Sequence, residues 1–274
     1  MRQTGFTPID QTANPPRGLL HQKRSFEHFE LTRFEPSPDL APYVENYWLI
    51  LWDLRGKPAY VQENLSHPSQ HLVLNPQDKT GIFGVATGRF SYRLAERGRV
   101  LGTKFHPGAF QGFLGQPVAA LTDTSIAISE VFGRSDAALD EEFLALDDPL
   151  AMAERVETML REIMPPLEDK ALTARRLVEL IAASPDILSV SGLAKGEGVT
   201  VRSLQRLFDT YIGVSPKWVI DRYRMIEAVD ALNRGEATSL TTLAHALGYF
   251  DHAHFSNAFL ALTGKSPSFY KQAI

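Results

Sequence analysis

The spacing of apolar residues changes partway along the chain. Between Phe26 and about Ala120, short runs of aromatic and β-branched residues alternate with Pro, Gly, Asn and Asp, a pattern typical of strands joined by turns. The clearest runs are NYWLILWDL, AYVQENL, QHLVLN, GIFGVATGRFSYRL and GRVLGTKFHPG, all within residues 46–108. Short strands at this spacing predict a β-rich domain, either a sandwich or a barrel-like sheet.

Beyond Leu121 the apolar residues recur at three- and four-residue intervals, which indicates amphipathic helices. Pro165 and Pro166 interrupt this pattern, and we place a domain boundary after them. The first residues are polar and rich in proline, so we expect a loose arm there. The predicted fold class is α+β, with the arm at 1–25, a β-rich domain with following helices at 26–166 and an all-α domain at 171–274.

The all-α domain contains the same pattern twice. A short helix, a tight turn, a second helix and a Gly-x-Ser-Pro sequence recur, joined by one long helix that starts at Pro216 and ends at Gly235. Thr200 and Asp251 are the expected N-caps of the two second helices. Two short helices joined by a tight turn form a helix-turn-helix unit, whose second helix enters the major groove of DNA.

The exposed faces of the two second helices differ in chemistry. The first presents Arg202, Ser203, Gln205, Arg206 and Asp209, and the second presents His252, Ala253, His254, Ser256 and Asn257. Arg and Gln make bidentate hydrogen bonds to guanine and adenine edges, so the first face is suited to reading bases. The second face is less cationic but rich in hydrogen-bonding groups. Two such helices about 34 Å apart could address adjacent major-groove segments.

The C-terminal third resembles the DNA-binding domain of the AraC/XylS family of transcription regulators. The motif positions in the second unit are Leu240, Leu243, Ala244, Gly248, Tyr249, Phe255, Phe259, Gly264, Ser266, Pro267 and Tyr270. Those in the first unit are Leu193, Ala194, Ser203, Leu204, Arg206, Leu207, Phe208, Gly213, Ser215 and Pro216. The resemblance implies a sequence-specific transcription regulator that binds double-stranded DNA and is not an enzyme.

Roles carried over from the family fall on nine residues. The resemblance implies base contacts by Arg202, Gln205, Arg206, His252, His254 and Asn257, and phosphate contacts by Thr200, Ser203 and Lys265. Members of the family usually carry Lys or Arg directly after the second Phe of the motif, where this chain has Leu260. A weak DNA binder that acts mainly through protein partners is therefore an alternative, and a shallow salt dependence would indicate it.

The N-terminal part resembles a domain found in a subset of these regulators, through Trp48 and the segment Gly102–Gly108. The resemblance implies a sensing or dimerisation domain. Aromatic side chains on a strand most simply pack in a core, and lining an apolar ligand pocket is the alternative. The candidate pocket residues are Trp48, Trp52, His71 and Phe105. A small-molecule effector, a homodimer and contact with RNA polymerase are the partners left open.

Metal binding is an alternative role for the histidines. His252 and His254 stand two residues apart on a helix and point in nearly opposite directions, whereas helical metal pairs use three- or four-residue spacing. His67, His71 and His106 lack the His-x-His spacing of a cupin-like site. We therefore expect no metal, no cofactor and no catalytic group. An enzyme-like or metal-dependent sensor fused to a DNA reader, with His71 or His106 as a ligand, is the alternative function.

Composition fits a DNA-binding protein of the cytoplasm. Residues 170–274 carry 12 Lys/Arg against 9 Asp/Glu, while the rest of the chain carries 16 against 23, so the basic part is the helical one. The chain has no cysteine, which excludes disulfides and permits a reducing compartment. It has no export signal and no apolar run near the roughly 18 residues of a membrane span, so we expect no membrane partner and a cytoplasmic location.

Overall fold

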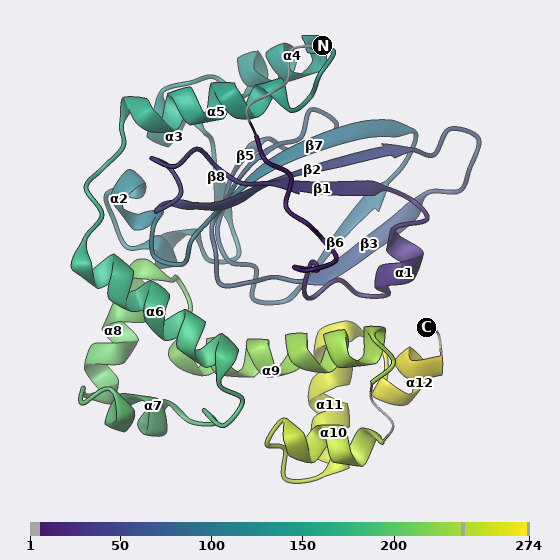
Figure 1. Cartoon of the computed structure of the whole chain (residues 1–274), viewed down its shortest axis with the longest axis vertical. Coiled ribbons are helices and arrows are strands. Elements are labelled where there is room, and N and C mark those ends of the chain that lie inside the picture. Colours follow the sequence, from purple (N-terminus) through teal and green to yellow (C-terminus); the bar gives the residue numbers. More distant parts are fainter. Residues whose placement is uncertain (1–5, 237–238, 273–274) are drawn as a thin grey trace.

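The computed structural model describes residues 6–236 and 239–272. Six antiparallel strands form one sheet in the order β1-β2-β7-β4-β5-β8, and two more form a separate ribbon (Figure 1). The sheet comprises β1 (Glu30–Phe34), β2 (Val44–Asp53), β4 (His71–Leu74), β5 (Gly81–Phe83), β7 (Arg97–Phe105) and β8 (Ser125–Ile126). The ribbon pairs β3 (Tyr60–Leu65) with β6 (Arg89–Leu94). The predicted β-rich N-terminal part is confirmed.

Alternation along β2 divides the apolar side chains between the two faces of the sheet. Tyr47 and Leu49 point into the main core. This core also contains side chains from the helices α2 (Gln111–Leu114), α3 (Ser129–Phe132), α4 (Asp136–Ala145) and α5 (Ala151–Glu162) and from the 3-10 helix η1 (Val118–Leu121). Trp48 and Trp52 point to the opposite face, in a smaller cluster beside the ribbon. The helices that follow the strands complete the predicted N-terminal architecture.

Two glycines of β7 make room for these tryptophans. A Cβ atom on Gly102 would lie 2.0 Å from Trp48 Cε2, and one on Gly98 would lie 2.1 Å from Trp52 Cζ2. No Cβ fits at such distances, so each indole lies flat against the bare backbone of the neighbouring strand. The Gly-x-x-x-Gly spacing of β7 therefore matches the four-residue spacing of the two tryptophans on β2.

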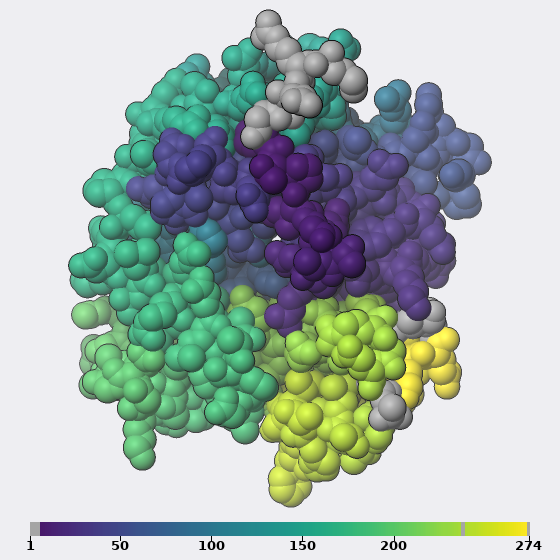
Figure 2. Space-filling view, in the orientation of Figure 1, coloured from purple at the N-terminus to yellow at the C-terminus, as the bar shows by residue number. Residues whose placement is uncertain are grey.

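The N-terminal segment is packed, which corrects the expectation of a loose arm for residues 6–25. Pro8 bridges to Phe34, and the segment then leads through Leu20, which is buried, into α1 (Gln22–Ser25). Figure 2 shows this purple segment against the yellow-green part of the molecule. Polar, proline-rich composition concealed the packing, because most of the contacts involve backbone groups and one arginine. Residues 1–5 of the expected arm lie outside the described residues.

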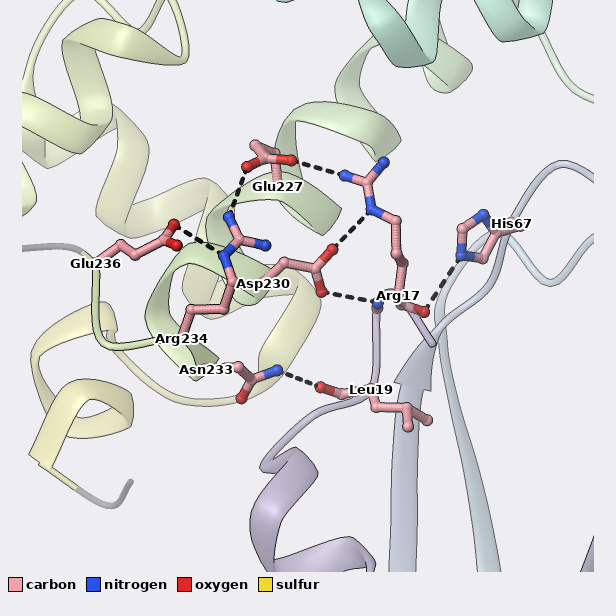
Figure 3. Close-up of polar contacts among 9 residues, drawn as sticks. Arg17, Leu19, His67, Glu227, Asp230, Asn233, Arg234 and Glu236 are labelled. Carbon is pink, nitrogen blue, oxygen red and sulfur yellow. Dashed lines mark hydrogen bonds and ion pairs between the residues drawn. The ribbon is translucent and has the colours of Figure 1, made fainter. Parts of the chain in front are cut away.

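Those contacts reach the long helix of the C-terminal domain (Figure 3). Arg17 Nε donates to Asp230 Oδ2 at 2.9 Å, and its Nη2 donates to Glu227 Oε2 at 2.7 Å. The amide of Gly18 donates to Asp230 Oδ1 at 3.0 Å, and Asn233 Nδ2 donates to the carbonyl of Leu19 at 2.8 Å. Charge-assisted contacts from Arg17 to two carboxylates hold the segment in one register on the helix.

The C-terminal domain consists of seven helices within the described residues. They are α6 (Asp169–Ala183), α7 (Val190–Gly196), α8 (Val201–Tyr211), α9 (Pro216–Asn233), α10 (Leu240–Ala246), α11 (His252–Thr263) and α12 (Pro267–Gln272). Each predicted helix is present, with α9 as the long connection between the units α7–α8 and α10–α11. Since α5 ends at Glu162 and α6 begins at Asp169, the segment between them contains the two prolines. The boundary itself stays a prediction.

The N-terminal part contributes side chains to both helix-turn-helix cores. Val85, in the loop between β5 and β6, is buried in the cluster of α6, α7 and α8. Leu20 and Leu65 are buried in the cluster of α9, α10 and α11. Arg222 of α9 is buried under the same loop, donates to the carbonyls of Thr87 and Gly88, and stacks on Trp218. The two halves of the chain therefore share their apolar cores.

Candidate nucleic-acid interface

The helix α8 presents the predicted first reading face. Thr200 caps it, accepting a hydrogen bond from the amide of Ser203 at 3.1 Å. Leu204 and Phe208 are buried, and their spacing turns the opposite side of the helix outward. Arg202, Ser203, Gln205 and Arg206 are all exposed there. The structure thus brings the predicted residues of the first unit together on one accessible face.

The helix α11 is built in the same way. Asp251 caps it, accepting from the amide of His254 at 2.7 Å, and Phe255 and Phe259 are fully buried. His254 and Asn257 are exposed, whereas His252 is half-buried, with its Nε2 3.4 Å from Ser256 Oγ. His252 therefore lies at the edge of the face rather than at its centre.

The two histidines of the His-x-His sequence have separate surroundings. His254 packs edge-on against Tyr249, with ring centroids 5.2 Å apart, while His252 faces Ser256 on its own helix. His254 also lines a cleft of about 310 Å³ between α9 and α11, together with Lys217, Asp221, Arg224, Met225, Tyr249, Ala258 and Leu262. Arg224 stacks on Tyr249 at 4.1 Å and donates to the carbonyl of Leu247 at 2.5 Å, which fixes the second unit on the long helix.

Aligning the units on their N-caps gives Ala253, predicted on the second face, its counterpart in the first unit, and draws attention to Phe250, which was not predicted. Thr200 then corresponds to Asp251, Arg202 to Ala253 and Arg206 to Asn257. Ala253 is exposed and occupies the centre of the second face. Phe250, directly before the cap, is also exposed. Counting positions from the two predicted caps pairs Ala253 with Arg202 from sequence alone, whereas the exposure of Phe250 is seen only in the structure.

Lys265 lies beyond α11 and is exposed, with its Nζ 4.9 Å from the ring of Phe269. Leu260 is exposed as well, at the position where the family usually carries a cation. The two residues lie near the C-terminal end of α11, away from the capped end that enters the groove. Of these two positions, only Lys265 offers a positive charge to a phosphate.

The four candidate pocket residues of the N-terminal domain do not come together. Trp48 donates from Nε1 to His71 Nδ1 at 3.3 Å on one face of the sheet, and Trp52 is buried on that face. Phe105 is buried on the other face, against Phe110, with ring centroids 4.8 Å apart. The grouping was wrong because β7 places Phe105 an odd number of residues from Gly102, which contacts Trp48.

A polar cluster lies near Trp48. Lys104 Nζ and Glu45 Oε1 form an ion pair at 2.7 Å. Burial, followed by the charge of Lys104, lowers the pKa of His67 to about 3 and that of His71 to about 4. Burial and the charge of Arg175 lower the pKa of His106 to about 4. The three imidazoles are therefore neutral near pH 7. Among the described residues, no three His, Asp or Glu side chains are grouped to hold a metal ion.

Comparison with known proteins assigns the helical domain to a class. Residues 193–273 match a family described as "Helix-turn-helix domain", and residues 32–127 match "Domain of unknown function (DUF6597)". The C-terminal domain is therefore a DNA-binding helix-turn-helix domain. Its motif positions and its transcription-activator relatives support an assignment of this domain to the AraC/XylS type.

Curated relatives are similar to part of this chain. The chain is 34% identical over 76 residues to the HTH-type transcriptional activator RhaS of Pectobacterium atrosepticum, covering 28% of this chain and 27% of that protein. It is 34% identical over 71 residues to the raffinose operon transcriptional regulatory protein RafR of Pediococcus pentosaceus, covering 26% of this chain and 25% of that one. The chain thus matches only about a quarter of the length of these curated relatives.

Two solved structures align with parts of this chain at low TM-scores. The C-terminal domain of AraT, a response regulator from Geobacillus stearothermophilus, aligns at 26% identity with a TM-score of 0.34, over 36% of this chain and 84% of that chain. ToxT K231A from Vibrio cholerae aligns at 11% identity with a TM-score of 0.41, over 83% of this chain and 97% of that chain. Within the described ranges, this chain has no helix whose length and apolarity would let it cross a bilayer.

Proposed function

We propose that this protein is a sequence-specific transcription regulator that acts on double-stranded DNA in the cytoplasm. The observation that carries the proposal is the pair of capped helices, α8 and α11, each with an exposed face beside a buried one. Arg202, Gln205 and Arg206 supply base-reading groups in the first unit, and Asn257 supplies one in the second. The matched helix-turn-helix family and the transcription-activator relatives support this function.

The N-terminal domain is the proposed sensor of a small effector. Its support is the shared packing: Val85 reaches the core of the first unit, and Leu20 and Leu65 reach that of the second. A rearrangement of the sheet or ribbon on binding an effector would therefore change the packing of both units. Contact with RNA polymerase belongs to the same proposal, because the matched relatives are named as transcriptional activators.

Replacing Arg206 with Ala tests the residue assignment. The exposed guanidinium makes no contact that the fold needs, so the free energy of unfolding should not change, whereas specific binding should weaken by about 1–3 kcal/mol at one base position. Titration against duplexes from the upstream region of its own gene, with each base pair varied in turn, measures this. Arg155→Ala removes the same charge from an exposed site on α5 and is the matched control.

Unchanged affinity and base preference in the Arg206→Ala variant would contradict the assignment of α8 as a reading helix. An equal loss in the Arg155→Ala control would show that net charge, not base contact, controls the affinity. Sequence-independent binding by the unmodified protein would contradict the regulator function itself.

A further inference from the structure

The exposed face of α11 carries one imidazole, that of His254, near its capped end and is otherwise apolar around a single amide. Opposite the buried Phe255 and Phe259, the outward positions are Ala253, Asn257, Leu260 and Ala261. The corresponding positions of α8 are Arg202, Arg206, Asp209 and Thr210. Helices with caps at equivalent positions and the same buried positions therefore present different chemistry: mostly charged groups in the first unit, and mostly methyl or methylene groups around Asn257 in the second.

Phe250 adds a large aromatic ring at the capped end of this face, and its side chain is 88% exposed. An apolar residue directly before an N-cap ordinarily packs on the fourth residue of the helix, here Phe255, and closes the helix start. In this structure Tyr249 takes that contact, with its ring centroid 5.4 Å from that of Phe255. Phe250 is therefore free of the usual structural role at its position.

The first unit repeats the feature in a smaller form. Val199, directly before the cap Thr200, is 45% exposed. Both units thus place an apolar side chain where the N-terminal end of the reading helix enters the major groove. The second unit has the larger side chain and lacks the arginines.

We propose that the second helix-turn-helix unit recognises thymine methyl groups, with Phe250 as the specificity-determining residue and Asn257 as an adenine contact. The inference rests on the proposed function as a DNA reader. The C5-methyl of thymine is the one apolar feature of the major-groove edge, and Ala and Phe are side chains that contact it. Asn pairs with adenine N6 and N7. The first unit, with Arg202 and Arg206, then selects guanine-containing sequence, and the full site has two chemically unlike halves.

Deoxyuridine tests this directly, because it pairs as thymine does but lacks the methyl group. The full-length protein first selects sites from a library of randomised duplexes. In the enriched duplex each thymine is then replaced by deoxyuridine, one at a time. Replacement at one or two thymines of one half-site should weaken binding about fourfold, the factor for losing one buried methyl or methylene group.

The variant Phe250→Ala completes the cycle. It should bind the thymine duplex about fourfold more weakly than the unmodified protein, and deoxyuridine at the same position should cause no further loss. Phe250→Leu should keep most of the discrimination, since Leu also presents apolar groups. Phe90→Ala removes a half-exposed ring from β6, outside both helix-turn-helix units, and should bind like the unmodified protein.

The outcomes separate the two levels of the proposal. If no sequence is enriched, the regulator function fails and this inference fails with it. If a site is enriched but deoxyuridine has no effect, or weakens Phe250→Ala as much as the unmodified protein, only the thymine reading is overturned. Unchanged DNA binding by Phe250→Ala, with reduced transcription in cells, would assign the ring to a protein partner and also overturn it. Equal thermal midpoints of the variants confirm that each is folded.

Discussion

The two helix-turn-helix units begin and end their reading helices in the same way. Thr200 and Asp251 accept from the amide three residues on, and Gly213 and Gly264 follow the helices with φ of 94° and 74°. Positive φ at these ends is adopted with least strain by glycine, which allows the chain to turn back toward the core. The scaffold of one unit is a copy of the other.

The two units differ in their exposed side chains and in the number of buried side chains that the N-terminal part contributes to each core. The first unit exposes arginines and takes one side chain, Val85, from the N-terminal part, whereas the second exposes apolar groups and takes two, Leu20 and Leu65. Buried positions are constrained by the fold, while the outward positions of α8 and α11 are free to set base chemistry. A match to the family therefore identifies the scaffold, and the exposed residues must be read separately for each unit.

Removing the apolar contacts between the N-terminal part and the two units should change the free energy of unfolding more than any other substitution proposed for comparing the units. Leu65→Ala leaves a cavity in the core of the second unit and should lower the free energy of unfolding by about 2–5 kcal/mol. Val85→Ala removes less volume from the first unit and should cost about 1–2 kcal/mol. Denaturant titration of the full chain measures both.

Val61→Ala is the matched control, because Val61 lies on the same strand as Leu65 but is 50% exposed. If Leu65→Ala destabilises the protein no more than Val61→Ala, the second unit does not depend on the ribbon, and the asymmetry in support between the units is wrong.

Low pH should destabilise the protein where the N-terminal part packs against α9, the helix that connects the two units. His67 lies edge-on to Tyr223 of α9, with ring centroids 5.9 Å apart, and burial holds the pKa of His67 at about 3 and that of His71 at about 4. Between pH 6.5 and about 4 the unfolded chain therefore binds protons that the folded chain does not. Stability should fall with falling pH in this window, by about 1.4 kcal/mol per pH unit for each histidine.

Denaturant titrations between pH 7 and 4.5 measure this slope. His71→Gln should flatten it relative to the unmodified protein, because one proton-binding difference is removed. A slope that is the same in the unmodified protein and in His71→Gln would contradict the burial of His71 as its cause.

Leu260→Lys should produce the smallest change, an increase in the salt dependence of DNA affinity. It tests whether the second unit contacts the phosphate backbone at this position. Leu260 is 47% exposed, so Lys fits without repacking and offers one more charge to DNA. The slope of log affinity against log salt should steepen by about 0.9. Leu172→Lys, on an exposed part of α6, is the control for net charge. If the two variants have equal slopes, position 260 lies outside the DNA contact. Leu260 would then not belong to the part of α11 that faces DNA.

The helical units were predictable because their signals are local. Cap residues, apolar spacing and terminal glycines lie within one helix length of one another, and Thr200, Asp251 and Gly264 have the expected roles. His252 was assigned to the exposed face, but it is half-buried because it stands three residues before Phe255 and so lies toward the buried side of the helix. Phe250 was not predicted as a site residue, because an apolar residue directly before a cap ordinarily packs on the helix that follows. Only the structure shows that Tyr249 makes this contact instead.

The N-terminal segment and the pocket residues depend on distant pairings. Arg17 meets Asp230 across 213 positions of sequence, so composition alone indicated a loose arm. Phe105 lies on the face opposite Trp48 because β2 pairs with β7 in one particular register, and a run of aromatic residues does not specify that register.

The cores shared through Leu20, Leu65 and Val85 bear on the exchange of modules between regulators. A chimera that joins the C-terminal helices of this chain to a foreign sensor would lack these three buried side chains. It would therefore have three cavities in its helical cores, two of them in the second unit. Grafting would succeed only with a sensor that supplies apolar side chains at those points, or with compensating larger residues in the helices. The natural cassette for engineering is therefore the DNA-binding domain together with the ribbon, the β5–β6 loop and the N-terminal segment that fill it.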